Sequence, residues 1–252
     1  MFFDSFVQRA EMIYCRQHRR ALTLVELLVI IAIIGILLAL LLPAIMKLRL
    51  LADDQEEKNQ LRVLGHAWLA YAKAHQGRPV NHRGSDPFDR WIHKLSSYGE
   101  LNDALISPAD PLKEERRKYL SANPNRFCSS YVLNPYFSTS ITDSVTGKQL
   151  SCERLSDCTS LSRALAILPV SPHAGVPGPG YIFPQGWLIP KATAWQRTTG
   201  RLGIQPDRFP LYGEAMPGRS NYFYADGHVE SVPADMIKNW IDAGHQFLMP
   251  QQ

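Results

Sequence analysis

One stretch of this chain constrains its fold more than any other: the 20 residues from Leu27 to Met46 contain no charged side chain. A helix of 20 residues rises about 30 Å, which matches the hydrocarbon core of a bilayer. The chain as a whole, 252 residues with 45% hydrophobic and 20% charged side chains, has the composition of a globular protein. We therefore expect one transmembrane helix near the N-terminus, followed by a folded domain.

Two other kinds of segment are long and apolar. A secretory signal peptide has a shorter apolar region of about 7–15 residues and ends at a cleavage site with small side chains. This run instead continues through Pro43 into Lys47 and Arg49. A core helix of a soluble domain is rarely apolar on every side. Charge does not orient the span, because basic residues both precede and follow it.

The junction before the span carries a more specific signal. It reads RRALTLVELL, from Arg19 to Leu28. It resembles the N-terminal signal of type IV pilins and type II secretion pseudopilins. In these families a basic leader ends in a small residue, and an apolar residue, Thr, two aliphatic residues and Glu follow. Ala21 stands where the families normally have Gly, and Pro43 falls where they often place a proline that kinks the helix.

This resemblance implies that a prepilin peptidase cuts between Ala21 and Leu22 and that the new amine of Leu22 is methylated. It also implies a role in assembly for Glu26, which would pair with the Leu22 amine of a neighbouring subunit. A lone carboxylate in lipid is unfavourable by about 2.5–3.5 kcal/mol, so Glu26 needs a partner. The alternative is a Glu26 that sits at the level of the lipid headgroups.

The helical pattern continues beyond the membrane. Leu61, Leu64 and Trp68 recur at three- and four-residue steps, and charged residues such as Asp54 and Glu57 are expected on the other faces. We expect one continuous helix from about Thr23 to His75. The resemblance implies a pilin-like α+β fold, in which the outer half of this helix packs on a small antiparallel sheet.

The chain accordingly divides into four parts. They are a basic leader (1–21), the transmembrane half of the helix (22–46), its amphipathic half (47–76) and an extracytoplasmic α+β domain (77–252). Within that domain we expect a short helix around Trp91, strands at 127–137 and 164–170, and a long loop at 173–190.

The clearest pattern of the soluble part lies near its end. Asp226 and Gly227 stand between two alternating apolar runs, which predicts a hairpin over 221–232 with a type I′ turn. A final helix is expected at 234–243.

The same hairpin resembles a family of pseudopilin-like proteins that combine the N-terminal signal with a C-terminal H-x9-DG element. Here Met216 replaces the His of that element. The stretches SPADP (107–111) and SYVLN (130–134) also resemble that family.

Motifs of enzymes and cofactor sites are missing from the sequence. It has no phosphate-binding glycine loop, no Gly-x-Ser-x-Gly and no H-E-x-x-H, and its eight His lack the spacing of a zinc site. Asp226 is explained by the turn, so we predict no metal site and no cofactor. The alternative that the sequence leaves open is a calcium site of loop carboxylates and carbonyls, as in some major pseudopilins, although no D-x-D-x-D-G loop is present. A net charge of +4 with scattered Lys and Arg argues against nucleic-acid binding. We do not expect an enzyme.

Four cysteines remain to be placed. Cys15 would leave with the leader, whereas Cys128, Cys152 and Cys158 would stay. In an oxidising compartment one pair could form a disulfide, either between Cys152 and Cys158 or between Cys128 and Cys152. Three reduced, buried cysteines are the alternative.

The function implied by the resemblance is structural. We expect a minor or atypical pseudopilin, anchored in the bacterial inner membrane with its C-terminal domain in the periplasm. Its partners would be a prepilin peptidase, other pilin or pseudopilin subunits and the lipid bilayer. The alternative is an anchored binding module for a carbohydrate or a protein that does not polymerise. That module would use the aromatic residues Tyr181, Phe183, Trp187 and Trp195.

Overall fold

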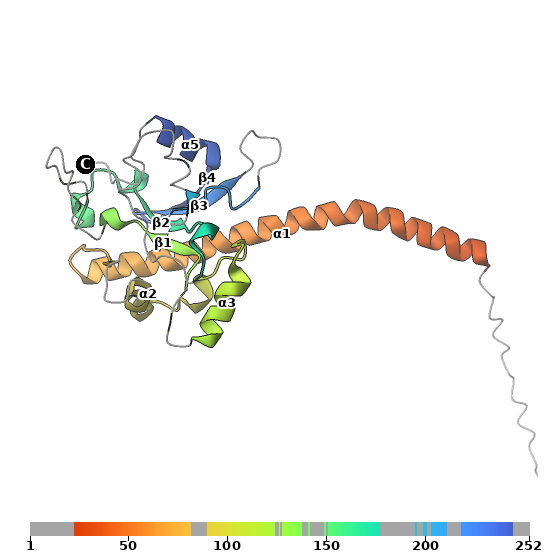
Figure 1. The fold of residues 1–252 in the computed structure, drawn as a ribbon, viewed down its shortest axis with the longest axis horizontal. Helices are drawn as coiled ribbons and strands as arrows, with labels where there is room; N and C mark the ends of the chain where they lie inside the picture. The colour runs from red at the N-terminus through yellow and green to blue at the C-terminus, as the bar shows by residue number, and fades with distance from the viewer. Residues whose placement is uncertain are drawn as a thin grey trace, which may run out of the picture. The chain divides into compact units, whose positions relative to one another are not determined.

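The computed structural model describes residues 23–81, 90–123, 126, 128–137, 141, 149, 151–176, 195, 199–200, 203–210 and 218–243. The chain forms two compact units, residues 1–47 and 48–252. The first unit contains the beginning of the helix α1. The second contains the rest of α1 and the sheet (Figure 1).

Helix α1 spans Leu24–Ala74, a run of 51 residues, as the sequence predicts. It ends because Gln76 and Gly77 adopt left-handed φ angles of 59° and 80°. The N–H of Gly77 donates to the carbonyl of Ala72 at 2.8 Å, which satisfies a carbonyl that the helix end leaves open.

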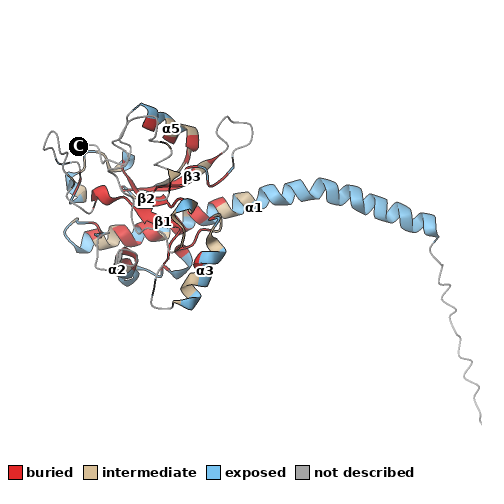
Figure 2. Ribbon diagram, viewed as in Figure 1, coloured by how far each residue is buried: buried red, intermediate tan, exposed pale blue. Residues whose placement is uncertain are grey.

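The part of α1 in the first unit is exposed along its whole described length. Every residue from Thr23 to Arg49 is exposed (Figure 2). Within the described residues, α1 is the one helix that is long and apolar enough to cross a membrane. So much exposed apolar surface is unfavourable in water, so this part of the helix requires lipid or other protein around it.

Four antiparallel strands form the sheet in the order β1-β2-β3-β4. They are β1 (Tyr131–Leu133), β2 (Leu165–Pro169), β3 (Arg219–Tyr224) and β4 (Val229–Pro233). Val132 lies opposite Leu168, and Asn221 lies opposite Ser231. Neighbouring strands of the sheet are consecutive in the chain, although about fifty residues separate β2 from β3.

The sheet separates two hydrophobic cores. The first contains Leu64 and Trp68 of α1 together with Phe223 of β3. The second contains Tyr222 of β3 and Ile237 of the C-terminal helix α5 (Ala234–Asp242). Because neighbouring residues of a strand point to opposite faces, β3 supplies a ring to each core. The sheet therefore lies between α1 on one face and α5 on the other.

A glycine allows α1 to approach the sheet closely. A β-carbon at Gly65 would lie 2.0 Å from the ring of Phe223, a distance that no side chain tolerates. The ring of Phe223 also meets Trp68 edge to face, with centroids 6.3 Å apart. The ring of Phe223 thus fills the space that a side chain at position 65 would take, and α1 packs closely on β3.

The described residues of the second unit also form shorter elements. The α-helices are α2 (Arg90–Leu95) and α3 (Lys113–Ala122). Single turns of 3-10 helix lie at Ser96–Tyr98, Asn102–Ala104, Pro135–Phe137, Leu155–Asp157, Leu161–Arg163 and Pro172–Ala174. The predicted short helix around Trp91 corresponds to α2, and the predicted C-terminal helix corresponds to α5.

Two local predictions differ from the structure. The strand expected at 127–137 pairs only over Tyr131–Leu133, because Pro135 has no N–H to donate and starts a 3-10 turn. The sequence analysis did not predict α3, whose residues are almost all polar and of which only Arg116 is buried.

Candidate functional site

The first turn of α1 contains the carboxylate that the sequence analysis singled out. Oε2 of Glu26 accepts hydrogen bonds from the backbone N–H of Thr23 at 2.8 Å and from the Thr23 hydroxyl at 2.9 Å. The backbone N–H of Glu26 donates to Oγ1 of Thr23 at 3.2 Å. This reciprocal arrangement is a capping box, which satisfies N–H groups at the start of a helix. Glu26 thus stabilises its own helix, a role that the sequence analysis missed.

The charge of Glu26 is not neutralised within the part of the chain that the structure describes. No Lys or Arg of that part forms an ion pair with it. The predicted cleavage and methylation site, Ala21 and Leu22, lies outside the described residues.

Pro43 lies inside α1, and the helix continues beyond it. A proline lacks the N–H that would donate to the carbonyl four residues earlier, here that of Ala39. A kink at Pro43 remains a prediction.

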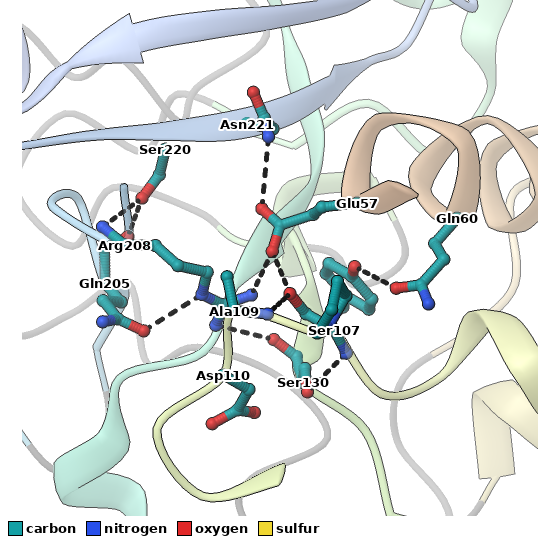
Figure 3. A network of polar contacts seen from close by, with 12 residues as sticks. Glu57, Gln60, Ser107, Ala109, Asp110, Ser130, Gln205, Arg208, Ser220 and Asn221 are labelled. Carbon is teal, nitrogen blue, oxygen red and sulfur yellow. Dashed lines mark hydrogen bonds and ion pairs between the residues drawn. The ribbon is translucent and has the colours of Figure 1, made fainter. Parts of the chain in front are cut away.

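A buried ionic cluster joins the outer half of α1 to the sheet (Figure 3). Its charged members are Asp54, Glu57, Asp110, Arg116, Arg208 and Arg219. At its centre, Nη1 of Arg208 lies 3.1 Å from Oε2 of Glu57, and both side chains are fully buried. The hydroxyl of Ser107 donates to the same carboxylate oxygen. A buried carboxylate needs such partners, because burial without them is strongly unfavourable.

Arg208 spreads its hydrogen bonds over several segments. Nη2 donates to the carbonyls of Ser130 and Val170, each at 3.2 Å, and Nε donates to Oε1 of Gln205 at 3.0 Å. Although burial disfavours the charged form, Glu57 and Asp110 outweigh it and raise the pKa of Arg208 above its usual value. The side chain therefore stays a cation and ties α1 to the ends of β1 and β2.

Asp54 is the second acidic residue of α1 that takes part in the cluster. Oδ2 accepts from Lys58 of the same helix and from Arg219 of β3, both at 2.9 Å. Oδ1 accepts from Nδ2 of Asn221 at 2.8 Å. The helix is thus bonded directly to the strand that also packs against Trp68.

Asp110 forms the third part of the cluster. Its Oδ2 accepts from Nε of Arg116 at 2.8 Å, and its Oδ1 accepts from the backbone N–H of Leu112 at 2.8 Å. Burial alone would raise the pKa of Asp110, but the guanidinium groups of Arg208 and Arg116 outweigh this and lower it. This carboxylate therefore remains charged in the folded domain.

The helical pattern predicts Asp54 and Glu57 on the polar faces of α1, and this prediction is wrong, because they are 2% and 0% exposed. The sequence does contain a signal. Positions 54, 57, 61, 64 and 68 form one series of three- and four-residue steps, so the two acids continue the apolar stripe. An acid within such a stripe indicates a buried partner of opposite charge.

The two short stretches that resemble the H-x9-DG family meet at this cluster. Ser107 and Asp110 belong to the first stretch, and Ser130 begins the second. The backbone N–H of Ser107 donates to Oγ of Ser130 at 3.0 Å. The similarity therefore concerns residues that hold the fold together. Met216 lies outside the described residues.

Asp226 and Gly227 lie in the loop between β3 and β4. Gly227 has a φ of 105°, whereas Ala225 and Asp226 have no positive φ. A type I′ turn requires positive φ at both central residues, so that prediction is wrong. The loop has three residues, because the N–H of Tyr224 donates to the carbonyl of His228 at 2.9 Å. One left-handed glycine at its end is enough to match the twist of the strands.

The side chain of Asp226 serves this turn. Its Oδ1 accepts from the backbone N–H of His228 at 3.2 Å and lies 2.6 Å from Nδ1 of the same ring. The ring of His228 stacks on the ring of Tyr224, with the two ring centroids 4.2 Å apart. Among the described residues, no group of three or more His, Cys, Asp or Glu is placed to hold a metal ion.

The aromatic residues of the alternative function are mostly outside the described part. Tyr181, Phe183 and Trp187 are not described, and Trp195 is half-buried and packs against the second core.

The fold defines a class of protein. A long N-terminal helix whose outer half packs on a four-stranded antiparallel sheet is a pilin-like α+β arrangement. Its exposed apolar beginning agrees with anchoring in a membrane.

Comparison with known protein families adds the specific feature. Residues 16–42 match the prokaryotic N-terminal methylation motif, which implies processing by a prepilin peptidase. The chain thus combines a pilin-like arrangement of helix and sheet with a prepilin-type N-terminal motif, and pilin-like proteins are generally structural subunits without enzymatic activity. Comparisons with curated proteins and with solved structures give no match.

Proposed function

We propose that this protein is a minor or atypical pseudopilin. A prepilin peptidase cleaves it between Ala21 and Leu22 and methylates the amine of Leu22. The mature chain, with its C-terminal domain in the periplasm, then enters a type II secretion or type IV pilus-like filament beside other subunits.

One observation carries this proposal: Glu26 is an acid without a cationic partner among the described residues, directly before the exposed, charge-free segment 27–46 of α1. Capping requires only an acceptor, which a neutral Gln also supplies. A full negative charge next to lipid is therefore unexplained by capping. An amine of a neighbouring subunit would explain it, because pairing of buried charges specifies the register between partners.

Processing is tested on the chain isolated from membranes of a cell with a prepilin peptidase. Mass spectrometry of the N-terminus should find a chain that begins at Leu22 with one added methyl group. A chain that retains Met1 or begins after Met46 would contradict the proposal.

Assembly is tested with three variants that separate charge from capping. Glu26→Leu removes the charge and the acceptor at this position, Glu26→Gln removes the charge and keeps an acceptor, and Thr23→Val removes the hydroxyl of the capping box and keeps the charge. All should be inserted into the membrane. We expect cross-linking to the major subunit to fall at least about tenfold in both Glu26 variants, which corresponds to about 1.4 kcal/mol of lost pairing, and to persist in Thr23→Val.

Unchanged cross-linking in Glu26→Gln would show that the charge is not used in assembly. A processed chain that never cross-links to a filament subunit would favour the anchored binding module instead.

A further inference from the structure

The structure distinguishes between the cysteines that the sequence left equivalent. Cys152 and Cys158 are both free thiols, and each lies near enough to the other to affect its pKa. Cys152 belongs to the first core and Cys158 packs against that core. Cys128 is different, because its Sγ lies 3.6 Å from Nη1 of Arg116 in the ionic cluster.

The segment between the two thiols is already held in a bent shape. Its 3-10 turn covers Leu155–Asp157, and the N–H of Cys158 donates to the carbonyl of Leu155 at 3.3 Å. At the other end, the N–H of Cys152 donates to the carbonyl of Tyr136 at 2.8 Å. A covalent bond between neighbouring thiols would therefore require little rearrangement of the backbone.

This segment also lies against the end of α1. The N–H of Leu155 donates at 2.9 Å to the carbonyl of Gly77, the residue at which the helix has already ended. The side chain of Leu155 packs against the first core. Fixing the segment thus fixes the place where the chain leaves α1.

We propose that Cys152 and Cys158 form an intramolecular disulfide that holds the 152–158 segment against the end of α1. Two thiols lose two electrons and two protons as the sulfur–sulfur bond forms. The acceptor is the disulfide of an extracytoplasmic thiol oxidant, which is reduced to two thiols. In the cell, this inference rests on the proposed function for the oxidising location of the domain.

The exposure of the two thiols indicates the order of events. Cys158 is half-buried and can reach an oxidant, whereas Cys152 is 1% exposed. The oxidant first forms a mixed disulfide with Cys158, and Cys152 then displaces it. Burial raises the pKa of both thiols, so few thiolates exist at neutral pH and the exchange is slow without a catalyst.

The test uses the full chain in detergent, equilibrated in a buffer of oxidised and reduced glutathione and then alkylated. Arg154 lies between the two cysteines, so trypsin separates them. We expect the peptides QLSCER and LSDCTSLSR to be recovered joined, two hydrogen masses below their sum, with Cys128 alkylated. Linkage to Cys128 or to a second chain, or alkylation of Cys152 and Cys158, would overturn the proposal.

Stability gives a second measurement, with Cys128→Ser as the matched control. Reduction should lower the Tm of the wild type and of Cys128→Ser by about 5 °C. It should leave the Tm of Cys152→Ser and Cys158→Ser unchanged. Equal shifts in all four proteins would contradict the proposed pair. Should a Ser variant fail to fold, the peptide masses of the wild type decide.

The same alkylation on intact cells separates this proposal from the proposed function. A chain that starts at Leu22 and has alkylated Cys152 and Cys158 would overturn the disulfide alone. A peptide that contains Cys15 would reveal a retained leader and count against the proposed function, while the test in glutathione buffer still decides on the disulfide.

Discussion

The guanidinium of Arg208 and the carboxylate of Glu57 lie 3.1 Å apart, fully buried, although 151 residues separate them in the chain. Glu57 belongs to the helix that continues into the membrane segment, and Arg208 belongs to the loop before β3. This pair therefore connects the N-terminal helix to the C-terminal part of the domain.

Removal of one member of this pair should be costly. Glu57→Gln or Arg208→Met leaves a buried charge without its counterion, so we expect a loss of about 3–5 kcal/mol in the free energy of unfolding. Replacement of both by Leu and Met should recover part of that loss. Urea denaturation of the full chain in detergent, followed by circular dichroism, measures it.

The matched control is Arg117→Met. Arg117 pairs with Glu114 at 3.0 Å, but both side chains are more than half exposed, so its removal should change stability by less than about 1 kcal/mol. Equal effects of Arg117→Met and Arg208→Met would contradict the importance of the buried pair.

The close packing at Gly65 makes a second prediction. Gly65→Ala places a methyl group against the ring of Phe223, and overpacking of this kind costs about 1–3 kcal/mol. Alanine favours a helix over glycine by about 1 kcal/mol, so we expect a net loss of up to about 2 kcal/mol. The thermal midpoint of the full chain measures this change.

Gly99→Ala is the control for Gly65. Gly99 has an extended φ of 176°, and a methyl group there would meet its nearest atom at 3.6 Å. Its substitution should be almost silent. A higher thermal midpoint of Gly65→Ala than of the wild type would show that Phe223 can move aside at little cost.

The hairpin glycine makes a third prediction. Any β-carbon at the φ of Gly227 is strained by about 1–2 kcal/mol, and Asn tolerates left-handed φ better than a β-branched residue does. Gly227→Val should therefore destabilise the domain more than Gly227→Asn. Protease resistance and thermal midpoint of the two variants give the order.

Asp226→Asn separates the turn from any chemistry at this loop. Asn keeps the Oδ1 acceptor for the N–H of His228, and the contact with the His228 ring is partly exposed, so stability should change little. A defect in assembly or binding with unchanged stability would instead assign a function to this side chain.

The charge state of Asp110 makes a prediction about pH. Its pKa is lowered from 3.8 in the folded domain, so the unfolded chain binds the proton more readily. The stabilisation is complete above pH 3.8 and is lost as the pH falls through the lower folded value. The thermal midpoint should therefore fall steeply below about pH 4.

Asp110→Asn should flatten this acid slope, even though the variant is less stable at every pH. Glu114→Gln, a change on the exposed surface, should leave the slope unchanged. An identical slope in Asp110→Asn and the wild type would contradict the assigned pKa shift.

Hydrophobic periodicity and turn residues in the sequence predicted those elements that depend on interactions between residues close in the chain. The apolar run, the helix from about 23 to 75 and the hairpin near 221–232 follow from periodicity and turn chemistry, which act between residues close in sequence. The type of turn was predicted wrongly, because two- and three-residue loops share the Asp-Gly signal and the register of the strands chooses between them.

The sequence by itself determined the anchor: a charge-free segment of membrane length and a motif with Glu26 at its start need no knowledge of the remaining chain. Only the tertiary structure decided where Asp54 and Glu57 lie, because an acid is buried or solvated according to whether a distant guanidinium reaches it. Arg208 and Arg219 lie more than 150 residues away in the chain, and the fold brings them to these acids. The same reason separates Cys152 and Cys158 from Cys128: proximity of side chains is a property of the fold.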